Sequence, residues 1–218
     1  MLARFKVCCI QDEAEAQLAV AAGASLLGLV SAMPSGPGVL PEERIAAIAR
    51  VVPPGVESVL LSARTDAEGL VAQIARCRTS AVQLVAPCEP DVHEALRQIV
   101  PGLRVIQVVH VEDESALEIA RRAAETADAL LLDSGAPSAS TPELGGTGRT
   151  HDWALSRAIV EASPKPVLLA GGLGPKNARE AWERVRPYAL DLCSALRPAG
   201  ALQPELLSAF ATALRGAD

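Results

Sequence analysis

The sequence is poor in aromatic residues, in positive charge and in long apolar runs, and each shortage argues against a class of function. Aromatic side chains make up only 2% of the 218 residues, so a surface that stacks nucleic-acid bases is not expected. The formal net charge is −6 at pH 7, and an acidic surface disfavours nucleic acids and anionic membranes as partners. No apolar run reaches the roughly 18 residues that a membrane-spanning helix requires.

Signals for secretion and for bound cofactors are also missing. Residues 1–6 lead into no apolar segment with a small-residue cleavage site, so we expect a cytoplasmic protein. The cysteine count is odd and the spacing irregular, which makes a poor disulfide framework and contains no zinc-type C-x2-C pair. The cysteines are Cys8, Cys9, Cys77, Cys88 and Cys193. No dinucleotide, pyridoxal or flavin motif is evident, so we expect neither a cofactor nor a metal.

Hydrophobic residues are abundant, at 50%, and they fall into short runs separated by helical segments rich in Ala, Glu and Arg. The runs expected to form strands are residues 5–10, 26–30, 56–61, 81–85, 104–109, 129–132, 166–170 and 190–193. The expected helices are residues 13–22, 41–51, 66–76, 90–100, 112–126, 152–162, 175–185 and 204–214. Most of the runs are continuously apolar, which is typical of parallel strands buried on both faces.

Eight strand–helix repeats over residues 1–218 predict an α/β fold, a single (β/α)8 TIM barrel forming one domain. A doubly wound open sheet is the alternative, although such a sheet more often has fewer strands and one dominant glycine-rich turn. In a TIM barrel the functional site lies at the carboxyl ends of the strands. The residues that follow each apolar run are therefore the candidate site residues.

Glycine-rich segments follow the sixth and seventh expected strands, and the small residues Ser194 and Ala195 follow the eighth. Glycine allows the backbone to approach a ligand closely, and successive backbone N–H groups then form an anion-binding nest. The loops after strands seven and eight are the usual phosphate position in this fold. We therefore expect a small phosphorylated substrate, although a single glycine pair can also serve a plain turn. The predicted phosphate-binding residues are Gly146, Thr147, Gly148, Gly171, Gly172, Ser194 and Ala195.

Several of these segments, taken in chain order, resemble the signatures of a known family. They are Lys6-Val7-Cys8-Cys9-Ile10, Leu130-Leu131-Leu132-Asp133, residues 145–153 (GGTGRTHDW), Leu169-Ala170-Gly171-Gly172-Leu173 and Asp191-Leu192-Cys193-Ser194. Together they are similar to the phosphoribosylanthranilate isomerase family. The resemblance covers nearly the whole chain and is more specific in the second half.

The resemblance implies an isomerase that carries out an Amadori rearrangement, in which an aminoaldose becomes an aminoketose. In the family, a cysteine on strand one is the base and an aspartate on strand six is the acid, which correspond to Cys8 and Asp133. A free thiol titrates near 8.5, so the site must lower the pKa of the cysteine. The carboxylic acid must instead be kept protonated by burial. From the residues alone, a strand cysteine can equally be core, and a strand-end aspartate can cap a loop.

The departures from the family pattern concentrate on the substrate side. The arginine that helps to hold the anthranilate carboxylate falls at Pro37, and the histidine that ends strand four falls at Val85. The glycine after the catalytic cysteine is Cys9, and the strand-eight glycine and glutamate become Ala195 and Arg197. Losing a guanidinium removes a bidentate clamp for a carboxylate.

These departures leave several functions open. The first is isomerisation of N-(5-phosphoribosyl)anthranilate in tryptophan biosynthesis, with Arg197 or Arg149 as a candidate replacement clamp. The others are isomerisation of another phosphosugar amine and non-catalytic binding of a phosphometabolite. An epimerase is a further possibility, although its usual paired His and Asp metal ligands are not visible. The sequence does not distinguish a monomer from a homodimer.

Two further expectations concern thiols and a histidine. Strands one and eight are neighbours in a closed barrel, so Cys8, Cys9 and Cys193 are expected to cluster and to make the activity sensitive to oxidants. Because adjacent strand residues face opposite ways, only one of Cys8 and Cys9 should enter the barrel. His151, where the family usually has Phe, is expected to face solvent at a helix start.

Overall fold

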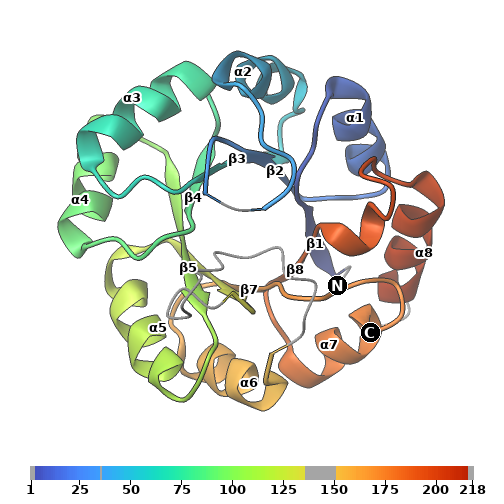
Figure 1. Cartoon of the computed structure of the whole chain (residues 1–218). Helices are drawn as coiled ribbons and strands as arrows, with labels where there is room; N and C mark the ends of the chain where they lie inside the picture. Colours follow the sequence, from blue (N-terminus) through green and yellow to red (C-terminus); the bar gives the residue numbers. More distant parts are fainter. Residues whose placement is uncertain (1–2, 35, 136–150, 216–218) are drawn as a thin grey trace.

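The computed structural model describes residues 3–34, 36–135 and 151–215, and within them eight parallel strands close into a barrel (Figure 1). Each strand pairs with its neighbours in sequence, and β1 pairs with β8 to complete the closure. This confirms the predicted TIM barrel. The strands are β1 (Arg4–Val7), β2 (Leu26–Val30), β3 (Glu57–Ser62), β4 (Ala81–Leu84), β5 (Arg104–His110), β6 (Ala129–Asp133), β7 (Val167–Leu169) and β8 (Ala189–Leu192).

A ring of helices surrounds the barrel (Figure 1). Several begin at an aspartate whose carboxylate accepts backbone N–H groups of the first turn, which stabilises the helix start; Asp12, Asp66 and Asp152 do this for α1, α3 and α6. The helices are α1 (Glu13–Ala21), α2 (Glu42–Val51), α3 (Ala67–Cys77), α4 (Pro90–Ile99), α5 (Ser115–Thr126), α6 (Trp153–Ala162), α7 (Ala178–Val185), the 3-10 helix η1 (Ser194–Leu196) and α8 (Pro204–Arg215).

The core has two layers because strand side chains alternate between the two faces of the barrel wall. Outward-facing side chains such as Phe5 and Val7 pack with the helices in the larger layer. Inward-facing side chains such as Val59 and Leu131 fill the barrel itself. Among the described helices, none is long and apolar enough to cross a membrane.

Candidate active site

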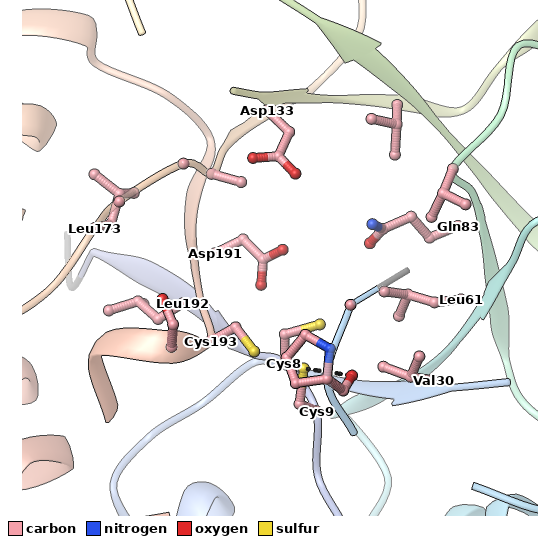
Figure 2. Close-up of a pocket in the computed structure, with 18 of the residues that line it drawn as sticks. Cys8, Cys9, Val30, Leu61, Gln83, Asp133, Leu173, Asp191, Leu192 and Cys193 are labelled. Carbon is pink, nitrogen blue, oxygen red and sulfur yellow. Dashed lines mark hydrogen bonds between the residues drawn. The ribbon is translucent and has the colours of Figure 1, made fainter. Parts of the chain in front are cut away.

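A cavity of about 750 Å³, part of it open to solvent, lies at the carboxyl ends of the strands (Figure 2). One side is apolar and comes from β2 to β5 and the loop after β2: Val30, Met33, Pro37, Leu61, Val85 and Val108. Gln83 of β4 adds a polar amide to this side, next to Leu61 (Figure 2). The other side carries polar and titratable groups: Cys8, Cys9, Asp133, Asp191, Cys193 and Ser194. The cavity can therefore hold a molecule with an apolar end and a reactive polar end.

A buried ion pair forms the floor of the polar side. Lys6 on β1 and Asp191 on β8 are register partners that both point into the barrel, and the Lys6 Nζ lies 2.8 Å from the Asp191 Oδ2. Lys6 is 0% exposed and Asp191 is 8% exposed. Burial opposes the charge on Lys6, but Asp191 and Cys8 outweigh it and raise the lysine pKa. The ammonium therefore stays charged in the barrel.

The thiol of Cys8 lies next to this ammonium. The Lys6 Nζ donates to the Cys8 Sγ at 3.4 Å. A hydrogen bond from Cys9 is the largest influence on the pKa of Cys8, and it lowers that pKa. Burial raises the pKa and the Lys6 charge lowers it, so that the net value is about 6. Cys8 is therefore largely a thiolate at neutral pH, the form that can accept a proton.

Cys9 overturns the expectation that only one of the consecutive cysteines enters the barrel. Both Cys8 and Cys9 line the cavity. Strand β1 ends at Val7 rather than Ile10, and Cys9 has a φ of +62°, in the left-handed region that breaks strand alternation. Its Sγ contacts the Pro37 carbonyl oxygen at 3.6 Å, as drawn in Figure 2. The left-handed backbone also gives a physical reason for glycine at this position in the resembling family.

The predicted thiol cluster is confirmed. The Cys9 side chain hydrogen-bonds to both Cys8 and Cys193, and the three sulfurs lie together on one side of the cavity (Figure 2). The hydrogen bond with Cys193 has the largest effect on the pKa of Cys9. The bond with Cys8 and burial also raise this pKa, so that Cys9 remains a thiol. Over the described part of the chain, no three His, Cys, Asp or Glu side chains are arranged to hold a metal ion.

Asp133 stands at the end of β6 and lines the same cavity as Cys8. Burial raises its pKa, against the lowering effects of the Ser134 N–H, which donates to Oδ1 at 2.7 Å, and of His110 and Lys6. The structure thus brings together a thiol with a lowered pKa and a carboxyl with a raised pKa. Figure 2 shows Asp191 between the two in that view.

The predicted phosphate-binding residues divide into three groups. Gly171, Gly172 and Ser194 line the cavity at the ends of β7 and β8. Ala195 is exposed and is not among the lining residues; its methyl group lies 2.8 Å from where Gly174 would carry a Cβ. The remaining three, at positions 146–148, lie outside the described residues.

The glycine turn after β7 depends on its lack of side chains. Gly171 and Gly172 have φ values of +84° and +62°, which L side chains rarely adopt. A Cβ on Gly171 would meet the Ser134 Oγ at 3.0 Å and the His151 Nδ1 at 3.1 Å. Among the described residues, the N–H groups of Gly171 and Gly172 donate to no protein acceptor, so they are available to an anion.

The substrate side carries no replacement arginine within the described residues. The Arg197 guanidinium forms a bidentate pair with Glu15, at 2.9 and 2.7 Å, and is not among the cavity-lining residues. The prediction that Arg197 could serve as a carboxylate clamp is therefore wrong, because the half-buried Glu15 carboxylate already occupies both of its terminal nitrogens. Arg149 lies outside the described residues. Pro37 and Val85 do line the cavity, and both are apolar.

His151 does not face solvent as expected. Its ring is largely buried, burial lowers its pKa to about 4, and its Nε2 lies 2.7 Å from the Ser156 Oγ. The neutral ring packs behind Gly171 and supports the glycine turn from outside the cavity. The position of His151 at a helix start did not predict its contact with Gly171, because Gly171 follows a different strand, β7.

Two polar residues that line the cavity, Gln83 and Asp191, and the buried Lys6 beneath it have no role predicted from the sequence. Lys6 and Asp191 form the buried ion pair, and the buried Gln83 Oε1 has no hydrogen-bond partner among the described residues. A charged side chain inside an otherwise apolar run was the available signal for Lys6 and Asp191. Such residues are rarely buried unless they are paired.

The fold and the site define a (β/α)8-barrel protein with a thiol of lowered pKa and a carboxyl of raised pKa at its mouth. A model of the N-(5'-phosphoribosyl)anthranilate isomerase family matches residues 5–213. The isomerase of that name from Methanocella arvoryzae is 36% identical over 193 residues, covering 88% of each chain. The one from Haloarcula marismortui is 35% identical over 200 residues, covering 91% of this chain and 89% of the relative.

Solved structures agree with this assignment. Phosphoribosylanthranilate isomerase from Thermus thermophilus superposes with a TM-score of 0.83 at 30% identity, covering 99% of this chain and 100% of the other. Monomers generated from the dimeric enzyme of Thermotoga maritima give 0.79 at 26% identity, with 99% and 100% coverage. The chain belongs to the N-(5'-phosphoribosyl)anthranilate isomerase family.

Proposed function

We propose that the protein isomerises a phosphoribosyl amine by an Amadori rearrangement, with N-(5'-phosphoribosyl)anthranilate as the foremost candidate substrate. The observation that carries the proposal is the pair of opposite pKa shifts on one cavity. The pKa of Cys8 is lowered to about 6, and the pKa of Asp133 is raised. Two titratable groups whose pKa values are shifted in opposite directions can act as base and acid at the same pH.

Asp133 is the proposed acid for opening the furanose ring. Its protonated carboxyl gives a proton to the ring oxygen while the bond between that oxygen and C1' breaks. The lone pair of the substrate amine then forms the C1'=N bond of a Schiff base. Burial favours the neutral carboxyl that this step needs, because the charged form is costly away from water.

Cys8 is the proposed base for the second step. Its thiolate removes the proton from C2', the C2'–H electrons form a C1'=C2' bond, and the C=N electron pair returns to nitrogen. Protonation of C1' and loss of the C2' hydroxyl proton, which forms the C2'=O bond, then give the aminoketose. Lys6 holds the thiolate in its charged form from 3.4 Å, and Asp191 fixes the lysine in the barrel.

Gly171, Gly172 and Ser194 are proposed to hold the phosphate together with residues 146–148. The support is their position on the cavity rim and the free N–H groups of the two glycines. Backbone N–H groups bind an anion without a basic side chain, which suits a chain with a net charge of −6. Ala195 remains a predicted contact of the same group.

Within the described residues, the wall opposite the acid–base pair offers no cation for an anthranilate carboxylate. Pro37 and Val85 face the cavity, and the Arg197 guanidinium forms an ion pair with Glu15. Another phosphoribosyl amine with an apolar aglycone is therefore the second candidate. Both candidates use the same phosphate rim and the same acid–base pair.

The test is a comparison of two phosphoribosyl amines generated in situ, one carrying anthranilate and one carrying aniline, which lacks the carboxylate. Turnover of the anthranilate compound, followed by loss of its fluorescence, supports the first candidate. Preference for the aniline compound supports the second. Binding of both as phosphate esters with no turnover of either would contradict the isomerase proposal and leave a phosphometabolite-binding protein.

A further inference from the structure

The three clustered thiols include a pair that is positioned to form a disulfide. The ladder between β1 and β8 pairs Lys6 with Asp191 and Val7 with Leu192, and the Cys8 N–H continues it by donating to the Leu192 carbonyl at 2.7 Å. The next pair in this register is Cys8 opposite Cys193.

Side-chain alternation places both members of this pair on the same face. Lys6 and Asp191, two residues earlier on each strand, point into the barrel, and residues two apart on a strand share a face. Cys8 and Cys193 accordingly both line the cavity, and Figure 2 shows their side chains on the same side of it. Adjacent strands lie about 4.8 Å apart, within the Cα separation of roughly 4.4–6.8 Å that disulfides require.

Cys9 is less suited to a disulfide with Cys8, although it contacts both neighbours. Consecutive Cα atoms across a trans peptide lie about 3.8 Å apart, below the usual disulfide range. The Cys9 thiol also keeps its proton because of its hydrogen bonds to Cys193 and Cys8. Its contacts with both sulfurs and with the Pro37 carbonyl hold the cluster together.

We propose that Cys8 and Cys193 form a reversible oxidation site that takes hydroperoxides as its oxidant. The Cys8 thiolate attacks one peroxide oxygen, the O–O bond breaks, and the leaving oxygen departs as water or alcohol after taking a proton. The Cys8 sulfenic acid is then attacked by Cys193, which forms the S–S bond and releases the sulfenic oxygen as water. The cysteines lose two electrons to the hydroperoxide, and a thiol reductant restores both.

Two other cysteines provide an internal control. Burial raises the pKa of Cys77 to about 12 and of Cys88 to about 11, and neither is among the residues that line the cavity. Since the thiolate is the form that reacts with peroxide, Cys77 and Cys88 should remain reduced while the Cys8–Cys193 pair oxidises.

The experiment treats the folded full chain with hydrogen peroxide near neutral pH and maps the products by peptide mass spectrometry, before and after dithiothreitol. The wild type should lose two hydrogen atoms, give a peptide crosslink between Cys8 and Cys193, and lose that crosslink on reduction. Cys9→Gly should keep the crosslink. Cys8→Ser and Cys193→Ser should lose the crosslink. In Cys193→Ser, Cys8 should instead accumulate as sulfinic and sulfonic acids, which dithiothreitol does not reduce.

Three results would overturn the proposal. They are thiols unchanged by peroxide, oxidation of Cys8 in the wild type without a crosslink, and a crosslink that requires Cys9 but not Cys8. Cys193→Ala replaces the serine variant if circular dichroism shows that Cys193→Ser does not fold. Because every readout is a mass on the folded protein, the outcome does not depend on whether the protein turns over a phosphoribosyl amine.

Discussion

Replacing Lys6 by methionine should raise the pKa of the Cys8 thiol. The Lys6 Nζ lies 3.4 Å from the Cys8 Sγ, and loss of an opposite charge at this range typically moves a pKa by roughly 1–3 units. The pKa of Cys8 is lowered to about 6 in the wild type. A rise of about 2 units would lower the thiolate fraction at pH 7 from roughly nine tenths to roughly one tenth.

The matched control is Asp191→Asn, which should act in the opposite direction. Asp191 places a second negative charge beside Lys6, and the two anions raise each other's pKa. Removing the carboxylate charge leaves the ammonium to Cys8 alone, so the pKa of Cys8 should fall below its wild-type value. Lys6→Met also leaves Asp191 buried without its partner, but a pKa of about 7 lets that carboxyl take up a proton.

The assay is the rate of iodoacetamide alkylation at Cys8 as a function of pH, measured on the Cys8 peptide by mass spectrometry in protein shown to be folded. Wild type should have its midpoint near pH 6, with Lys6→Met above it and Asp191→Asn below it. Midpoints that coincide in all three proteins would refute the claim that the Lys6 charge contributes to the lowered pKa of Cys8.

Three further predictions address the rim, the Arg197–Glu15 ion pair and the pH profile. Gly171→Ala forces a φ of +84° on an L residue, so it should cost about 1–2 kcal/mol of unfolding free energy in urea melts and raise KM; an unchanged KM would remove Gly171 from the phosphate site. Arg197→Met leaves the half-buried Glu15 without its partner and should cost about 1.5–3 kcal/mol, whereas Arg179→Met, on an exposed helix pair, should change stability by less than about 1 kcal/mol; equal losses would contradict this account. Below about pH 6 the Cys8 thiolate takes up a proton, so kcat/KM should fall about tenfold per pH unit, and a flat profile down to pH 5 would argue against a thiolate base.

The barrel was predictable because its signal is repeated and local. Short continuous apolar runs and helical segments recur eight times, and the structure confirms that Asp66 and Asp152 mark helix starts. The same pattern placed Asp133 at a strand end. Such features depend on neighbouring residues in the chain, so the sequence alone was sufficient to locate them.

The site was less predictable where it depends on contacts between distant elements. The Lys6–Asp191 pair joins residues 185 positions apart, and the Arg197–Glu15 pair joins residues 182 apart. The entry of Cys9 into the cavity follows from a single left-handed φ that the alternation rule for strands does not anticipate. Each of these was set by tertiary packing.

The pKa values could not be read from the sequence either. The family resemblance implies a lowered Cys8 pKa and a raised Asp133 pKa, but no feature of the sequence gives a cause for either shift. The structure supplies a Cys9 hydrogen bond and the Lys6 charge for Cys8, and burial for Asp133.

The most direct test of the central claim is turnover of phosphoribosyl amines by the wild type beside Cys8→Ser and Asp133→Asn, with binding of the phosphate ester measured in parallel. The account predicts that each variant loses about 100-fold or more in kcat while binding of the phosphate ester changes little. Retention of wild-type turnover by either variant would contradict the assignment of Cys8 as base and Asp133 as acid.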